Sequence, residues 1–350
     1  APFVNAEKPQ YLVIEDSFPN GRPALEKDFG VYMADRNTVN LSERMKVTVC
    51  LNPVHSATGP LGVVLGYDLF AHMLNTNEDM MKIQPELTWQ RLPMTVQGIG
   101  LDIASISREG TGEPVGFLHG FGSSKEDYAD FVRHRAFEGQ PFIAWDAPGC
   151  GESQCADYSK MGLPFLLETA LKVISHAGFT RFHLVGHSMG GLTSLLLAHA
   201  FPERVLSFVN IEGNIAPEDC FLSRQIVQYA EPDAERFFAR FIERTRQSPA
   251  WASALYASSL PQKVRAEAVP GIFSSMVDYS DHGELMAEFL NLPCPKMFMY
   301  GDQNAGLSYL SSIARRGVKL AEIPHCGHFP MYSNSPEMWR QIALLQQASR

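Results

Sequence analysis

Residues 182–192 constrain the fold more than any other part of the sequence. The stretch begins with a short, mainly apolar run that is typical of a buried strand, and it ends with apolar residues that are typical of a buried helix. Between them lies Gly-His-Ser-Met-Gly at 186–190. Glycine has no Cβ, so Gly186 and Gly190 let a strand and a helix pass each other closely on either side of Ser188. The stretch therefore predicts a strand, a sharp turn that carries Ser188, and a helix.

Length and composition allow a large globular core. The chain has 350 residues, of which 45% are hydrophobic and 19% are charged, so we expect one large domain with an accessory segment. The net charge of -9 disfavours nucleic acid and anionic membranes as partners. No apolar run has the length of a bilayer span, and no signal peptide is visible. We expect a cytoplasmic protein. Because the first residue is Ala1, the sequence leaves open that an upstream segment was removed and that the protein is secreted.

The six cysteines are scattered along the chain without a C-x-x-C pair. In a chain of this length the pattern favours neither a disulfide framework nor a zinc site, and we expect most of the thiols to be buried as small apolar groups. Cys150 and Cys155 are the closest pair, so a bridge between them stays open. No cofactor or metal motif appears, and we expect neither cofactor nor metal.

Residues 1–84 form a segment of their own. Strand-like runs at 11–14, 31–33 and 46–51 are separated by proline, glycine and asparagine, and residues 61–74 are apolar enough for a strand or a helix. We expect a β-rich arm or small lobe. Because the segment carries no catalytic motif, its expected role is scaffolding or contact between copies of the chain, and we expect a homodimer or higher homo-oligomer.

The pattern changes to alternating strands and helices at 85–213 and again at 291–350. Repeated strand–helix units predict a mostly parallel sheet that is covered on both faces. Ser124 and Asp127 have the spacing of a capping box, which predicts a helix from there onward. Between the two parts, residues 214–290 have a helical pattern that is rich in aromatic side chains. We therefore predict an α/β core that is interrupted by a helical cap.

Four motifs occur in a fixed order at the ends of predicted strands. They are His-Gly-Phe-Gly at 119–122, Asp-Ala-Pro-Gly-Cys-Gly-Glu-Ser at 146–153, Gly-His-Ser-Met-Gly-Gly at 186–191 and Gly-His at 327–328. Each motif alone is weak, but the set resembles an α/β-hydrolase-fold enzyme over about residues 90–350. The resemblance implies an eight-stranded, mostly parallel sheet with a helical cap inserted after the sixth strand. The N-terminal β-rich extension lies outside it.

Ser188 lies at the nucleophile position that this resemblance implies. A serine hydroxyl is a weak nucleophile at neutral pH and needs a base within hydrogen-bond reach. His328 follows the last predicted strand, where the chain order serine, acid, histidine places the base. We expect His119 and His187 to shape the loop or the pocket wall, and His325 lies three residues too early for the base.

The acid is the ambiguous member of the site. In many family members it lies two residues after the aspartate of a Gly-Asp-x-Asp pattern, and here that position holds Asn304, which carries no charge. Glu212 ends the strand predicted at 205–211, the sixth strand of the sheet that the resemblance implies. This is the alternative acid position in haloalkane dehalogenase-like, luciferase-like and lactonase-like members. We assign the acid to Glu212 and keep Asp302 as the alternative, although Asp302 is better placed to fix the turn.

Two backbone N–H groups are expected to form the oxyanion hole, those of Met189 and Phe121. Such donors stabilise the negative charge that develops on a carbonyl oxygen under attack. The cap should supply an apolar, aromatic-lined cavity. The residues expected to line the substrate pocket are His119, Gly120, His187, Trp251 and Phe329.

These residues predict a serine hydrolase that cleaves an ester or lactone of a small, largely apolar molecule through an acyl-enzyme. Ser188 would attack the carbonyl, His328 would take and return the proton, and Glu212 would orient His328. Dehalogenases and epoxide hydrolases need an aspartate where this chain has serine, which disfavours them. The same groups would serve a carbon–carbon bond hydrolase or an acyltransferase, and the fold can also serve as a non-catalytic ligand receptor. These alternatives stay open.

Overall fold

The computed structural model describes residues 3–6, 11–15, 31–34, 87–247 and 251–348. The chain divides into two units, Ala1–Pro85 and Glu86–Arg350. Each unit contains one sheet, and the larger unit contains all the motifs on which the predicted chemistry depends.

The first unit contains a three-stranded sheet of β1 (Phe3–Ala6), β2 (Tyr11–Glu15) and β3 (Val31–Ala34). β2 pairs antiparallel with β1 and parallel with β3. The strands expected at 11–14 and 31–33 are β2 and β3. The runs at 46–51 and 61–74 lie outside the described residues.

The second unit is built around a nine-stranded sheet in the order β12-β11-β10-β9-β6-β7-β5-β4, with the short β8 paired to β5. β4 and β5 form an antiparallel hairpin, β7 runs antiparallel to β5, and all pairs from β7 through β6 to β12 are parallel. The expected mostly parallel sheet is confirmed, with β8 added to the eight strands. The strand bounds are β4 (Thr88–Val96), β5 (Ile99–Arg108), β6 (Val115–Leu118), β7 (Phe142–Trp145), β8 (Gln154–Cys155), β9 (Phe182–His187), β10 (Val205–Ile211), β11 (Lys296–Gly301) and β12 (Lys319–Ile323).

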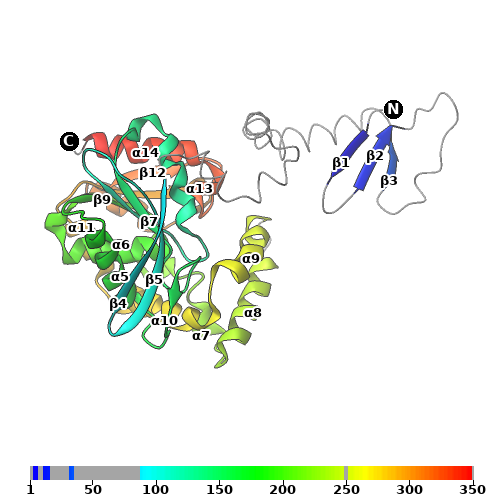
Figure 1. The fold of residues 1–350 in the computed structure, drawn as a ribbon, viewed down its shortest axis with the longest axis horizontal. Coiled ribbons are helices and arrows are strands. Elements are labelled where there is room, and N and C mark those ends of the chain that lie inside the picture. Colours follow the sequence, from blue (N-terminus) through cyan, green and yellow to red (C-terminus); the bar gives the residue numbers. More distant parts are fainter. Residues whose placement is uncertain (1–2, 7–10, 16–30, 35–86, 248–250, 349–350) are drawn as a thin grey trace. The chain divides into compact units, whose positions relative to one another are not determined.

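Helices cover both faces of this sheet and enclose two apolar cores (Figure 1). On one face α5 (Leu163–His176), α6 (Met189–Ala200) and α12 (Leu310–Arg315) bury apolar side chains against the strands. On the other face the core is formed with η3 (Lys125–Arg133) and α14 (Ser335–Ala348). Two covered faces explain why the central strands β6, β7 and β9 are buried along their whole length.

The chain between β10 and β11 is helical, as the pattern at 214–290 predicts. Its last helix packs on the sheet, because the Phe289 ring lies 5.9 Å from Phe208 of β10 and 6.3 Å from Phe298 of β11. None of the described helices is both long and apolar enough to cross a bilayer. The helices in this interval are η6 (Pro217–Asp219), α7 (Gln225–Gln228), α8 (Ala234–Arg246), α9 (Trp251–Lys263), η7 (Ala266–Ala268), α10 (Val269–His282) and α11 (Leu285–Asn291).

Two local expectations need correction. The segment from Lys125 is a 3-10 helix, and Ser124 makes no side-chain cap hydrogen bond to it. Asp127 instead accepts hydrogen bonds of 2.8 and 2.9 Å from the Tyr332 hydroxyl, so the capping box does not form. Cys150 and Cys155 are both free thiols, so the bridge that the sequence left open is absent from the described residues.

Candidate active site

Ser188 is the single residue between the end of β9 and the start of α6. Its backbone has φ 51° and ψ −119°, a conformation that residues with a side chain rarely adopt. A Cβ at Gly186 would lie 2.5 Å from the Gly190 carbonyl oxygen, and a Cβ at Gly190 would lie 2.3 Å from the Leu118 carbonyl oxygen. Both contacts are with backbone, so this turn requires glycine at both positions. The sharp strand–turn–helix predicted from 186–190 is confirmed.

His328 and Glu212 meet at the edge of the sheet where the parallel strands end. Glu212 directly follows β10, and His328 lies in the loop after β12. The Nδ1 atom of His328 lies 2.7 Å from Oε2 of Glu212, and the two side chains are only 12% and 6% exposed. A carboxylate at Nδ1 selects the tautomer in which Nε2 is free to accept a proton. The pair therefore has the geometry of an oriented base.

Asn304 holds the Glu212 carboxylate in place. Its Nδ2 group donates to both oxygens of Glu212, at 2.9 and 2.8 Å, and the Gly301 N–H donates to Oε1 at 2.8 Å. The residue at the more common acid position thus donates to the carboxylate that follows the neighbouring strand. The sequence shows only that Asn304 carries no charge, and nothing in the local pattern indicates this contact.

Asp302, the alternative acid, fixes the turn before His328. Its two oxygens accept hydrogen bonds from the N–H groups of Cys326 (3.0 Å) and His325 (2.8 Å). These two backbone donors hold the pKa of the Asp302 carboxyl below its usual value. Within the described residues, the carboxylate hydrogen-bonded to His328 is that of Glu212.

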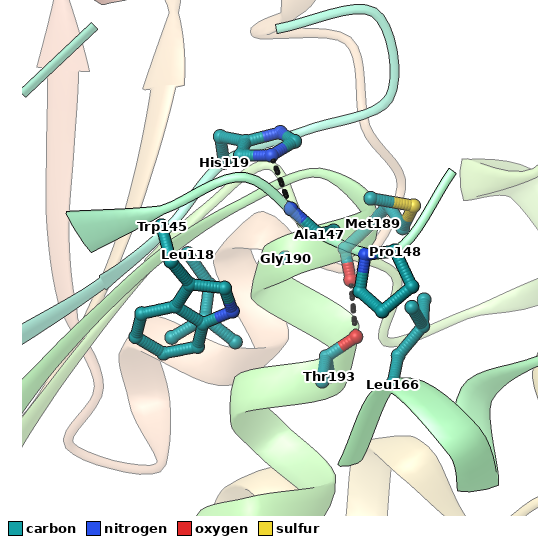
Figure 2. A pocket seen from close by; sticks show the side chains of 9 residues that line it. All are labelled: Leu118, His119, Trp145, Ala147, Pro148, Leu166, Met189, Gly190 and Thr193. Carbon is teal, nitrogen blue, oxygen red and sulfur yellow. Dashed lines mark hydrogen bonds between the residues drawn. The ribbon is translucent and has the colours of Figure 1, made fainter. Parts of the chain in front are cut away.

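The loop after β6 directs the N–H group of Phe121. The Gly120 carbonyl, which belongs to the same peptide group, accepts hydrogen bonds from His119 Nδ1 at 2.7 Å and from the Ser123 N–H at 3.1 Å. The His119 Nε2 atom accepts from the Ala147 N–H at 2.9 Å, which assigns the ring proton to Nδ1 (Figure 2). With its carbonyl held from two sides, this peptide keeps the Phe121 N–H in one direction, as an oxyanion hole needs.

Tyr256 of α9 contacts the loop after β6. Its hydroxyl donates to the Phe121 carbonyl at 2.8 Å, and burial raises the pKa of that hydroxyl well above its ordinary value, so it stays a donor. A Cβ at Gly122 would lie 2.6 Å from the Tyr256 ring and from the Leu260 side chain. The helix therefore packs directly on the loop, and the sequence held no signal for this contact.

Met189 begins α6, and its N–H group belongs to the first turn, where helical amides have no intrahelical acceptor. The helix N-terminus also carries a partial positive charge. The Phe121 N–H donates to no backbone carbonyl among the loop hydrogen bonds of the described residues. Within the described residues neither amide thus has a backbone acceptor, which is a requirement for the donors of an oxyanion hole.

His187 is fully buried and lies next to His328. Its Nε2 atom bonds to the His328 carbonyl at 2.8 Å, and the two rings are 4.8 Å apart. Burial, together with the charge that His328 can carry, lowers the pKa of His187 well below its ordinary value of 6.5. The Phe329 ring lies 5.2 Å from His187 and 5.1 Å from His328. Trp251 starts α9, but its side chain lies outside the described residues.

Next to the start of α6, which follows Ser188, lies a cavity of about 20 Å³ (Figure 2). Its walls include His119 and Met189 but neither Ser188 nor His328. The hydroxyl of Thr193, another wall residue, donates to the Met189 carbonyl at 2.9 Å. A space of this size holds about one water molecule. The cavity lies next to the loop after β6 and is too small for a substrate.

The class of protein follows from where Phe121, Ser188, Glu212 and His328 lie. They follow β6, β9, β10 and β12, so they meet at the carboxyl edge of one mostly parallel sheet, as in α/β-hydrolase-fold proteins. The model of the alpha/beta hydrolase family matches residues 117–341, and the chain belongs to this family.

Curated relatives differ in activity. A D-mannonate oxidoreductase of Thermotoga maritima is 50% identical over 101 residues, which are 29% of this chain and 16% of that protein. A pimeloyl-[acyl-carrier protein] methyl ester esterase of Aeromonas hydrophila is 31% identical over 34% of this chain and 44% of its own. A 2-hydroxy-6-oxononadienedioate/2-hydroxy-6-oxononatrienedioate hydrolase of Klebsiella pneumoniae is 24% identical over 66% of this chain and 86% of its own. The chain spans less than half the length of the first two.

Solved structures share the fold at low identity. A thermophilic esterase from Thermogutta terrifontis superposes with a TM-score of 0.60 at 20% identity, covering 74% of this chain and 99% of that one. An N-acyl homoserine lactonase superposes with a TM-score of 0.57 at 18% identity, covering 75% and 97%. At these identities the likeness shows the fold alone.

Proposed function

We propose that this member of the family is a carboxylic ester hydrolase that acts on an ester or lactone of a small, largely apolar molecule. The observation that carries the proposal is the 2.7 Å contact between His328 Nδ1 and Glu212 Oε2, at the edge of the sheet that also presents Ser188. A histidine oriented in this way is the base that a serine nucleophile requires.

In the proposed reaction the Ser188 hydroxyl attacks the carbonyl carbon while His328 Nε2 takes its proton. The charge on the carbonyl oxygen is stabilised by the N–H groups of Phe121 and Met189. The intermediate then collapses to an acyl-enzyme, and His328 gives the proton to the departing alcohol. A water molecule then attacks the acyl-enzyme in the same way, with His328 as the base, and releases the carboxylic acid product. Glu212 stabilises the charged form of His328 in both halves.

The side chains packed around the loop after β6, which would form the oxyanion hole, are aromatic and largely buried, in keeping with an apolar substrate. The Phe121 ring lies 4.7 Å from Phe273 and 6.2 Å from Phe241, both on helices between β10 and β11. These rings make the surroundings of the loop aromatic. The pimeloyl ester esterase and the lactonase named above are relatives in keeping with an ester or lactone substrate.

Carbon–carbon bond hydrolysis is the second candidate. The Klebsiella relative, whose name gives a 2-hydroxy-6-oxo dienedioate as its substrate, aligns over 66% of this chain, more than the other two relatives named above. The same serine, histidine and carboxylate would serve that reaction.

The test is a screen of p-nitrophenyl esters, lactones and β-diketones with wild type and Ser188→Ala. We expect hydrolysis of esters or lactones by wild type alone, and mass spectrometry should show an acyl group on the peptide that contains Ser188. Cleavage of diketones without ester turnover would assign the carbon–carbon reaction, and transfer of the acyl group to an added alcohol would assign an acyltransferase. Tight ligand binding that survives Ser188→Ala, without turnover by wild type, would assign a receptor.

A further inference from the structure

Three aromatic side chains and His328 form a continuous row of ring contacts, which we call the aromatic row. Phe221 meets His328 edge-on with ring centres 5.2 Å apart, His328 meets Phe329 at 5.1 Å, and Phe329 stacks on Tyr332 at 5.6 Å. The members come from separate parts of the chain. Phe221 lies between η6 and α7, and Tyr332 lies in α13 (Pro330–Ser333).

Both ends of the row are open to solvent. Phe221 is 58% exposed although its ring contacts the largely buried pair of His328 and Glu212, and Tyr332 at the other end of the row is 54% exposed. Exposed apolar surface that adjoins a reactive group is typical of a ligand site. Part of the row is also fixed in position. The Tyr332 hydroxyl is bonded to Asp127, and the Phe329 ring lies 5.1 Å from Tyr256.

The position of the row indicates which part of a substrate would reach it. Glu212 occupies Nδ1 of His328, so Nε2 must be the atom that gives the proton to the departing alcohol. The alcohol oxygen therefore has to come within hydrogen-bond distance of the His328 ring, and the group attached to that oxygen lies against the side chains around the ring. The acyl group lies on the other side of the reacting carbonyl.

We propose that the aromatic row is the subsite for the leaving alcohol and that it takes a neutral, flat apolar group such as a benzyl or aryl group. The inference rests on the proposed ester hydrolysis. Flat rings that pack edge-on or offset against other rings gain more binding free energy than the burial of their apolar area alone provides. The charged groups in contact with the row within the described residues are Glu212, which is bonded to His328, and Asp127 and Lys263, which lie at the Tyr332 end. Asp127 and Lys263 have opposite charges, and Glu212 is paired with His328, so these contacts favour an uncharged leaving group over a charged one.

The test compares benzyl acetate, ethyl acetate and acetylcholine, which share one acyl group. We expect wild type to favour benzyl over ethyl acetate by at least about tenfold in kcat/KM, and we expect Phe221→Ala to reduce that ratio by about fivefold to tenfold, because one face of the bound ring returns to water. Val227→Ala is the matched control. Val227 is 66% exposed on α7 and is not part of the row, so its ratio should stay within about twofold of wild type.

A second variant guards against a folding defect. Phe221→Leu keeps an apolar side chain but loses the flat ring, so it should lower the ratio of benzyl to cyclohexylmethyl acetate. A ratio that is unchanged in both Phe221 variants would overturn the inference, and so would a wild-type preference for acetylcholine, which would assign the row to a cation. If wild type cleaves none of these esters, nor any p-nitrophenyl ester, in a Ser188-dependent way, the proposed function fails and the subsite assignment fails with it.

Discussion

Replacing Glu212 by glutamine should remove most of the activity, for a reason visible in its contacts. The oxygen of the new amide would accept the Gly301 N–H, as Oε1 does now at 2.8 Å. The NH2 group would then face two other donors, the Asn304 amide and the Nδ1 proton of His328. His328 can relieve this clash only by moving its proton to Nε2, and in that tautomer Nε2 cannot accept the proton of Ser188.

The size of the effect has two parts. Two unit charges about 4 Å apart interact by about 4 kcal/mol at the effective dielectric of about 20 that suits partly buried sites. Losing that stabilisation of the charged histidine slows the reaction about a thousandfold. The tautomer change adds to the loss, so we expect kcat to fall by about 10³ to 10⁴, with KM within about threefold of wild type.

Initial rates with p-nitrophenyl acetate at pH 7 measure this directly. Asp302→Asn is the matched control, because it makes the same carboxylate-to-amide change at a side chain that bonds to the His325 and Cys326 N–H groups. We expect this control to lose less than about tenfold in kcat. If Glu212→Gln kept more than a tenth of wild-type kcat while Asp302→Asn was inactive, the assignment of the acid would be refuted in favour of Asp302.

Two further changes test other contacts. Tyr256→Phe removes the hydroxyl that donates to the Phe121 carbonyl but keeps the ring. We expect kcat and the affinity for a boronic acid inhibitor to fall together by about tenfold, with KM little changed. Tyr300→Phe is the control, because its hydroxyl contacts Glu322, and an equal loss in this variant would contradict the role of Tyr256. Burial raises the pKa of Asp219 from 3.8 to about 6, so the folded state binds a proton more tightly than the unfolded chain. The wild type should therefore lose about 1 to 2 kcal/mol of stability relative to Asp219→Asn as the pH rises from about 4 to about 6, and parallel curves from urea unfolding would argue against it.

Local sequence patterns were enough to predict the parts of the site that depend on backbone geometry. The turn at Ser188 needs glycine on both sides, and that requirement is visible in residues 186–190 alone. Strand ends were also predictable, because a short apolar run ends where polar residues follow. The placement of Glu212 and His328 at one edge followed from the strand order that the resemblance implied, and their contact agrees with it.

Side-chain partners that come from distant parts of the chain were not predictable. Asp127 has the spacing of a capping box with Ser124, yet its partner is Tyr332, which lies 205 residues away. The contact between Tyr256 and the Phe121 carbonyl spans 135 residues. Such pairs depend on how helices pack on the sheet, and a single sequence carries no periodicity that reports it.

The contact between Asn304 and Glu212 brings the segments that follow two adjacent strands together beside the histidine ring. β10 and β11 are neighbours in the sheet, and Glu212, which follows β10, meets Asn304 of η8 (Asp302–Asn304), which follows β11, at 2.8 Å. An acid carried by either strand could therefore serve His328, with an amide on the other strand to hold it. The two arrangements differ by an exchange of side chains between neighbouring positions, and the exchange needs no change in the base or in the turn that carries Ser188.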